Sequence, residues 1–183
     1  MIVLGIVGFI GSGKDTAAKY IEEKYGYKTI SYSELVHEKT REEGLETTRE
    51  NLQMIAKKYR ENYGMDYFAR LAVEKALNSG CEKIILKDLR RKEDVEVPKQ
   101  FFERFYVIEI YANKKIRFER LKRRGSIKDP KTWKEFVKQE ENEKLLGFHE
   151  AVKYADFRIK NNGSIEDLKS QIDQLMKKIE GFE

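Results

Sequence analysis

Residues 2–16 read IVLGIVGFIGSGKDT, an apolar run followed by a glycine-rich segment. Residues 2–7 are rich in β-branched side chains and stop at Gly8, which is typical of a strand buried on both faces of a parallel sheet. The segment that begins at Gly8 matches G-x-x-x-x-G-K, and residues 14–24 then carry apolar side chains at near-helical spacing. This order favours phosphate binding, because a helix N-terminus presents backbone N–H groups to an anion.

Each residue type in this loop has a chemical reason. Glycines let the backbone curl around phosphates without obstruction by a Cβ atom, and a lysine supplies positive charge for the β and γ oxygens. We expect the donor phosphates to bind at one continuous segment, namely Gly8, Phe9, Ile10, Gly11, Ser12, Gly13, Lys14, Asp15 and Thr16.

The motif departs from its usual form at Asp15, where serine or threonine normally binds Mg²⁺. A carboxylate is a stronger hard-oxygen ligand, but it repels a triphosphate unless the metal intervenes. We therefore expect Mg²⁺ dependence, with Asp15 as a metal ligand and Thr16 as a substitute for it.

The rest of the chain alternates strands with helices. Further strands are predicted at 28–31, 83–87, 105–111 and 155–160, and the third and fourth strands are separated by a Glu/Lys-rich segment that contains Pro98. Helices are predicted at 33–43, as two helices between 48 and 78 broken at Gly64, and at 114–124, 132–144 and 164–179. This alternation predicts a single three-layer α/β domain over residues 1–183, with a five-stranded parallel sheet covered by helices on both faces.

Composition narrows the possible classes of protein. The chain has 37 Lys+Arg against 32 Asp+Glu, and this modest excess suits anionic ligands without indicating nucleic acid. The single cysteine, Cys81, cannot form an internal disulfide, and two distant histidines give no zinc spacing. The N-terminal apolar run is too short to span a membrane. We expect a cytoplasmic monomer or homodimer, and the Lys/Glu-rich composition fits a hot environment.

Three segments resemble a known superfamily. The form G-S-G-K-D-T resembles the loop of P-loop kinases of small phosphorylated molecules, and of phage deoxynucleoside monophosphate kinases in particular. Residues 117–124, RFERLKRR, followed by Asp129 and Pro130, resemble the arginine-bearing lid of adenylate/cytidylate-kinase-like proteins and of dephospho-coenzyme A kinases. Residues 155–163, ADFRIKNNG, resemble the A-D-x-x-I-x-N-x-G segment that ends those kinases and lines the adenine pocket.

The resemblance implies a P-loop NTPase fold and a reaction with ATP and Mg²⁺. It implies a lid at about 117–131, in which Arg120 and Arg124 neutralise developing charge, and it places Asn161 beside the donor nucleotide. The acceptor is then expected on the helical region at about 33–80, where Arg49 and Arg60 are candidate ligands for its phosphate.

Residues 86–90, LKDLR, lie at the end of the third predicted strand. The superfamily that the chain resembles often has D-G-I-R at this place. An acidic residue here can bind the magnesium hydration shell or orient the acceptor, so Asp88 is a candidate metal and acceptor ligand. Arg90 is a candidate ligand for the acceptor phosphate. Leu89 departs from the glycine of the superfamily.

Three functions are open at this point. The first is an ATP-dependent phosphotransferase acting on a nucleoside or deoxynucleoside monophosphate, which uses every motif found. The second is dephospho-coenzyme A kinase, which shares the loop, the lid and the final segment. The third is a nucleotide-dependent nucleic-acid-binding protein or switch, which the pI of about 9.0 suggests; lysines interleaved with glutamates argue against it, and no nucleic-acid partner is expected.

Overall fold

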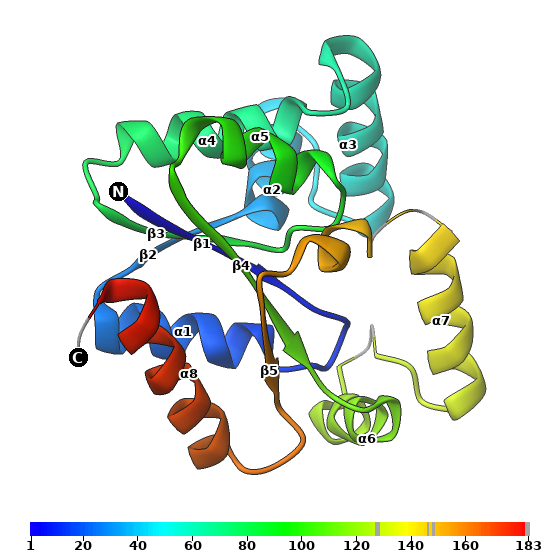
Figure 1. Ribbon diagram of the computed structural model, residues 1–183. Coiled ribbons are helices and arrows are strands. Elements are labelled where there is room, and N and C mark those ends of the chain that lie inside the picture. The colour runs from blue at the N-terminus through cyan, green and yellow to red at the C-terminus, as the bar shows by residue number, and fades with distance from the viewer. Residues whose placement is uncertain (127–128, 146, 148, 182–183) are drawn as a thin grey trace.

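The polypeptide folds around five parallel strands in the order β2-β3-β1-β4-β5 (Figure 1). The computed structural model describes residues 1–126, 129–145, 147 and 149–181. The strands are β1 (Ile2–Val7), β2 (Lys28–Ser31), β3 (Lys83–Lys87), β4 (Arg104–Tyr111) and β5 (Phe157–Lys160). The helices are α1 (Lys14–Tyr25), α2 (Tyr32–Glu42), α3 (Arg49–Tyr63), α4 (Tyr67–Asn78), α5 (Glu93–Phe101), α6 (Lys114–Arg124), α7 (Trp133–Leu145) and α8 (Ile165–Glu180), with a short 3₁₀ helix, η1 (Glu150–Tyr154), before β5.

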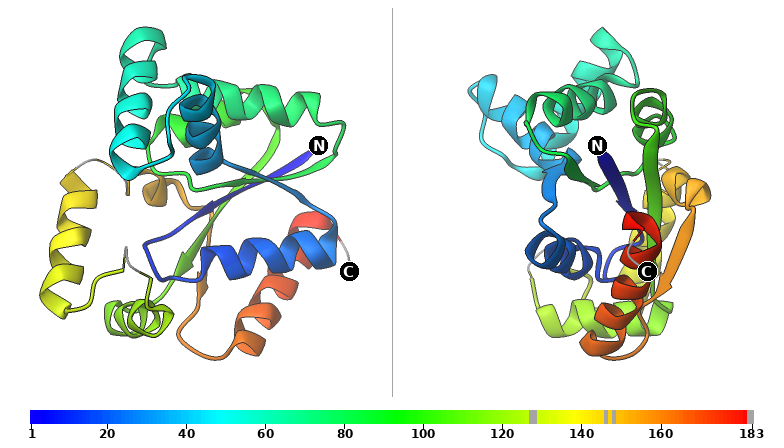
Figure 2. Two further views of the ribbon diagram at one scale, coloured as in Figure 1. Left: turned by 180° about the vertical axis from the view of Figure 1, so that it is seen from behind. Right: turned by 60° about the vertical axis from the view of Figure 1, so that its left-hand side comes forward.

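The predicted three-layer architecture is confirmed. Side chains alternate along β1, so Val3 and Val7 pack with α2, α4 and α5 while Leu4 and Ile6 pack with α1 and α8. The two sets of helices lie on opposite faces of the sheet in each view (Figures 1 and 2). Because both faces are covered, β1 is apolar along its whole length, as the run at residues 2–7 predicted.

The strand order positions the phosphate loop. β1 pairs with β3 on one side and with β4 on the other. The strands β2 and β3, which come first after β1 in the chain, lie on one side of it, and the later strands β4 and β5 lie on the other side. The strand order therefore reverses its direction at β1. In open α/β sheets, ligands bind outside the carboxyl ends of the strands at this switch point. The loop that follows β1 lies at that crevice.

A small third cluster attaches α6 and α7 beyond the carboxyl ends of β1 and β4 (Figure 1). Phe118, Leu121 and Phe136 are buried together, and Ile10 of the phosphate loop packs against them. The lid helix therefore contacts the loop that it is expected to serve. Residues 127–128 of the predicted lid lie outside the described residues.

The Glu/Lys-rich segment around Pro98 predicted no helix or strand, whereas the structure has helix α5 there. Proline lacks the N–H that would bond to the carbonyl four residues earlier, which is why it usually breaks a helix. Here the Tyr32 hydroxyl donates to that carbonyl, the main-chain oxygen of Asp94, at 3.2 Å. A tertiary contact thus satisfies the acceptor that Pro98 leaves open.

The predicted start of α2 also needs correction. The helix predicted to begin at Ser33 has its N-cap at Ser31, whose Oγ accepts from the Glu34 N–H at 3.2 Å. The fifth strand begins at Phe157 instead of the predicted Ala155, because Ala155 caps η1 and its N–H donates to the Val152 carbonyl.

Candidate functional site: a phosphate loop facing an acidic and basic pocket

The loop after β1 leads directly into helix α1. Gly13 is the N-cap of α1 with a left-handed backbone (φ 98°), and no side chain caps the helix. Ser12 N–H donates to Phe9 O at 3.1 Å, which closes the turn of the loop. The first N–H groups of α1 are therefore left for another acceptor, which is the arrangement that binds phosphate at helix N-termini.

None of the three glycines of the loop can be replaced without displacing a neighbour, and a Cβ atom on Gly11 would lie 2.9 Å from the main-chain oxygen of Arg117. A Cβ atom on Gly8 would lie 2.4 Å from the main-chain oxygen of Ile110, and one on Gly13 would lie 2.3 Å from Nδ2 of Asn161. The buried Oγ of Ser12 has no hydrogen-bond partner among the described residues. Close backbone approach and an unsatisfied hydroxyl both fit a phosphate cradle.

Lys14 begins α1 and carries the loop's positive charge. Its Nζ donates to the main-chain oxygen of Phe9 at 3.3 Å, so the ammonium lies over the loop. Burial lowers the pKa of Lys14, although nearby Asp88 and Asp15 act in the opposite direction. A partly desolvated ammonium at this place is suited to a phosphate, because electrostatic attraction is stronger away from bulk water.

Asn161, at the end of β5, anchors the loop. Its Nδ2 donates to the Ser12 carbonyl at 2.8 Å, and its own main-chain oxygen accepts from Arg120 Nη2 at 2.9 Å. Arg120, from α6, is thereby tied to the phosphate loop through Asn161. Both residues lie beside the expected donor site, and Asn161 holds the loop through its hydrogen bond to Ser12.

A cavity of about 520 Å³ lies next to this anchor, between α6 and the start of α8. Its lining comes from two segments, Lys115, Ile116, Glu119, Arg120 and Arg123 on one side and Asn162, Gly163, Ser164 and Ile165 on the other. The resemblance of residues 155–163 to known kinases predicts an adenine pocket at this final segment. The cavity is of a size that accommodates a base.

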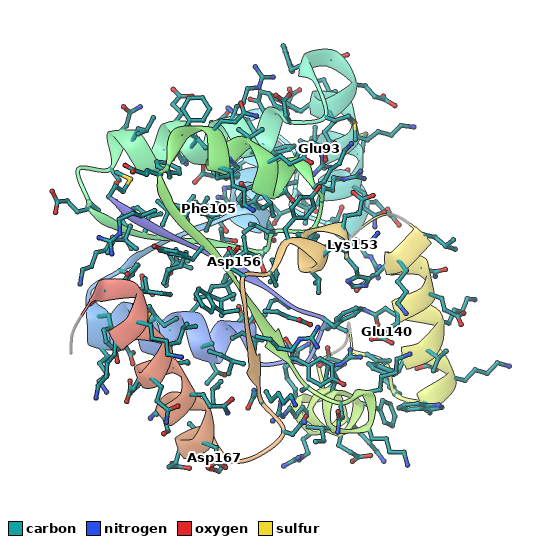
Figure 3. The ribbon with its side chains drawn as sticks, viewed as in Figure 1. Glu93, Phe105, Glu140, Lys153, Asp156 and Asp167 are labelled. Carbon is teal, nitrogen blue, oxygen red and sulfur yellow. The ribbon has the colours of Figure 1, made fainter. Side chains whose placement is uncertain are left out.

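The Asp156 of the same segment is structural. Its carboxylate accepts from the Val107 N–H at 2.8 Å, and its own N–H donates to the Val107 carbonyl at 2.8 Å (Figure 3). It therefore joins the start of β5 to β4. This contact fixes the position from which Asn161 reaches the loop.

On the other side of Lys14, Asp88 directly follows β3. This residue has a left-handed backbone (φ 68°), a conformation that aspartate tolerates better than bulkier residues. Its Oδ2 accepts from the Ser31 hydroxyl at 2.7 Å. Leu89, which stands where the superfamily has glycine, is buried against the sheet, so the departure fills the core and leaves Asp88 at the crevice.

A smaller cavity of about 110 Å³ brings the two sides together. Its lining comes from the phosphate loop, the end of β3, helix α7 and the residue before η1, namely Gly8, Ile10, Lys14, Asp88, Leu89, Arg90, Glu143 and His149. The predicted Lys14, Asp88 and Arg90 thus line one pocket. Sequence reasoning missed Glu143 and His149, which lie over a hundred residues away from the loop in the chain.

His149 is held in place by the loop. Its ring stacks on Phe9 with centroids 4.0 Å apart, and Nε2 lies 3.8 Å from Oε2 of Glu143. Burial lowers the pKa of His149 to about 4, with contributions from the positive charges of Lys144 and Arg117. The imidazole is therefore neutral at physiological pH.

The predicted acceptor arginines do not all lie together. The N–H groups of Arg90 and Arg91 both donate to Oδ2 of Asp94, at 2.9 and 3.0 Å, which fixes the backbone after β3. Burial lowers the pKa of Arg60, and the charges of Arg91 and Arg90 lower it further, so Arg60 lies near this group. Arg49 is exposed at the first residue of α3, away from Arg60 by most of the helix length.

The lid arginines have distinct contacts. Arg117 is buried, paired with Glu140 of α7, and donates Nε to the Ala112 carbonyl at 3.0 Å, so it is a structural residue instead of a phosphate clamp. Arg124 pairs with Asp129 and donates Nε to it at 2.8 Å. A role for Arg124 in phosphoryl transfer stays a prediction that requires this pair to open.

The candidate metal ligands lie on either side of Lys14. Asp15 and Thr16 are exposed in the first turn of α1, and Asp88 lies at the end of β3. Within the described part of the chain, no three His, Cys, Asp or Glu side chains form a metal cluster. Mg²⁺ in kinases takes one or two carboxylates plus phosphates and water, so two separated carboxylates fit it.

Comparison with known proteins agrees with this architecture. A family model described as an AAA domain matches residues 7–137. A shikimate kinase from Acinetobacter baumannii has a similar structure with a TM-score of 0.60, 16% identity and coverage of 99% of this chain and 94% of its own. The protein TT1252 from Thermus thermophilus gives a TM-score of 0.61 at 19% identity, covering 97% of both chains. The fold and the loop are those of a P-loop kinase-like protein.

The chain itself belongs to the UPF0200 family. It is 33% identical over 183 residues to a UPF0200 protein of Thermococcus kodakarensis, with 98% of each chain covered. A second UPF0200 protein, from Methanothermobacter thermautotrophicus, is 30% identical over 98% of this chain and 91% of its own length. Among the described residues, no helix is both long and apolar enough to cross a membrane.

Proposed function

We propose that this protein is an ATP-dependent phosphotransferase whose acceptor is a nucleoside or deoxynucleoside monophosphate. One observation carries the proposal: Lys14 of the phosphate loop lines the same small cavity as Asp88 and Arg90. A donor phosphate on the loop and an acceptor held beside β3 would therefore meet at the lysine. Phosphoryl transfer needs little more than this positioning and charge stabilisation.

The donor half of the site has a defined set of contacts. The N-terminus of α1 and Lys14 would hold the β- and γ-phosphates, and Arg120 would approach them from α6, where it is tied to Asn161. The 520 Å³ cavity beside Asn162 would hold the base. Mg²⁺, held by Asp15 or Thr16 with Asp88, would neutralise charge on the transferred phosphoryl group.

The acceptor half of the site is proposed from the arginines that lie at or near the small cavity. Arg90 lines the cavity, and Arg60 lies close enough to Arg90, Arg91 and Asp94 for their charges to act on it. A group of guanidiniums at this place favours an acceptor that carries negative charge. Guanidinium groups bind phosphate well because their planar N–H pairs match its oxygens. A monophosphate acceptor fits these guanidiniums.

Acceptor-stimulated ADP release from Mg·ATP tests the proposal. The panel contains the common ribo- and deoxynucleoside monophosphates, dephospho-coenzyme A and shikimate, with Lys14→Ala as the control. Stimulation by one nucleoside monophosphate, lost in the control, supports the proposal and identifies the substrate. Stimulation by dephospho-coenzyme A or shikimate alone replaces the proposed acceptor, and no stimulation by any acceptor contradicts it.

A further inference from the structure

Asp15 creates an electrostatic problem within the phosphate site. It occupies the first turn of α1, where the helix dipole and free N–H groups attract anions. A carboxylate at this point offsets that attraction, and its negative charge acts on the neighbouring Lys14, which is expected to bind the triphosphate. The neutral hydroxyl that usually follows the lysine of this motif has neither effect.

The structure contains a partner for this charge. Lys87, the last residue of β3, donates Nζ to Oδ1 of Asp15 at 2.7 Å. The Lys87 side chain is 22% exposed, whereas that of Asp15 is 76% exposed. The lysine is thus held by the sheet, and the carboxylate reaches it from the rim of the crevice.

The pair connects the two halves of the site. Asp15 follows Lys14 in α1, and Lys87 precedes Asp88 in β3, so each partner is adjacent in the chain to a residue lining the small cavity. Lys87 pairs with the exposed face of α1 and is absent from the lining of that cavity. It acts on the loop through Asp15.

We propose that Lys87 is a positioning residue for nucleotide binding: it neutralises and orients Asp15, so that a carboxylate can occupy the hydroxyl position of the phosphate motif without repelling the triphosphate. This inference rests on the proposed binding of Mg·ATP. It assigns a function to a residue of β3 that belongs to neither the phosphate loop nor the lid.

Calorimetric ATP binding, with and without Mg²⁺, tests the inference on four proteins: the wild type, Lys87→Met, Asp15→Ser and the double variant. Loss of Lys87 alone leaves Asp15 unbalanced, so the dissociation constant for Mg·ATP should rise about tenfold, and more without Mg²⁺. In the double variant the site has the usual hydroxyl and no unbalanced carboxylate. Its affinity should return to within about threefold of that of Asp15→Ser.

Two control variants separate the effect of the Lys87–Asp15 pair from the effect of removing any lysine. Lys87→Arg keeps the charge and should restore most of the affinity. Lys24→Met removes a lysine that pairs with Asp173 at 2.7 Å near the other end of α1, and should leave ATP binding unchanged.

The outcomes distinguish the inference from the proposed function. Wild-type protein that binds no Mg·ATP contradicts the proposed function itself. Wild-type binding with unchanged affinity in Lys87→Met overturns the inference alone. A double variant as weak as Lys87→Met also overturns it, because Lys87 would then contact the nucleotide directly instead of acting through Asp15.

Discussion

At the scale of single residues, Gly13 is a tightly constrained position of the loop. Both Gly13 and Gly26 have left-handed backbones, with φ of 98° and 72°, but a Cβ on Gly26 meets nothing within 4 Å. Gly26→Ala should therefore cost only the backbone strain, about 1 kcal/mol. Gly13→Ala should cost about 2 to 4 kcal/mol, because it also displaces Asn161 from Ser12.

Denaturant unfolding of both variants, together with ATP binding, measures this difference. Gly13→Ala should lose nucleotide binding while Gly26→Ala keeps it. Equal stability and equal binding in the two variants would contradict the assignment of Asn161 as the anchor of the loop.

The titration of His149 is expected to make the free energy of unfolding depend on pH. Its pKa is lowered by burial to about 4, whereas in the unfolded chain it is near 6.5. Between these values the unfolded chain binds the proton and the folded one does not, so stability falls as the pH drops from about 6.5 to about 4. The loss from this group should be roughly 2 to 3 kcal/mol.

His149→Phe keeps a ring to stack on Phe9 and removes the titration. The free energy of unfolding of this variant, compared with that of the wild type at pH 7 and pH 4.5, should depend less on pH. An identical pH dependence in the two proteins would show that His149 is not buried as a neutral imidazole.

The candidate site was predictable from the sequence where its residues are contiguous. The loop from Gly8 to Thr16 could be identified because its spacing and its place between strand and helix are local properties. Glu143 and His149 could not, because only the packing of α7 and Phe9 brings them to Lys14. The Ser31 N-cap had a local signal, since Ser31 and Glu34 have the spacing of a capping box.

At the scale of elements, one buried carboxylate joins α6 to α7. Glu140 lies on the inner side of α7 (Figure 3), where it pairs with both Lys114 and Arg117. Arg117 is only 4% exposed, so loss of the carboxylate would leave a buried charge uncompensated. Glu140→Gln should therefore destabilise the protein by about 3 kcal/mol.

The neighbouring Glu141 is an exposed residue of α7, and Glu141→Gln is the matched control. Chemical denaturation should separate the two variants clearly. If Glu140→Gln unfolds at the same denaturant concentration as Glu141→Gln, the pair does not hold the lid helix in place.

Helix α5 shows why one element could not be predicted from the sequence. Acidic residues in its first turn are favourable for a helix, but Pro98 in its interior argues against one. The Tyr32 hydroxyl that compensates for the proline comes from α2, more than sixty residues earlier. No local pattern could have indicated that contact.

At the scale of the whole molecule, alternation of strands and helices predicted the layers and the parallel sheet. It did not predict the order β2-β3-β1-β4-β5, because the buried apolar residues of β1, β3 and β4 do not show which of these strands lie next to one another. The order matters for function, since it places the loop after β1 between the ends of β3 and β4. The crevice at this switch point is where donor and acceptor are proposed to meet.

The most direct test of the central claim is transfer of the γ-phosphoryl group itself. Purified protein is incubated with γ-labelled Mg·ATP and each nucleoside or deoxynucleoside monophosphate, and the products are separated. We predict one labelled nucleoside diphosphate, with Lys14→Ala reducing its rate of formation by about 10² to 10³-fold. Label that appears only in inorganic phosphate, or equal product formation in Lys14→Ala, would contradict the account.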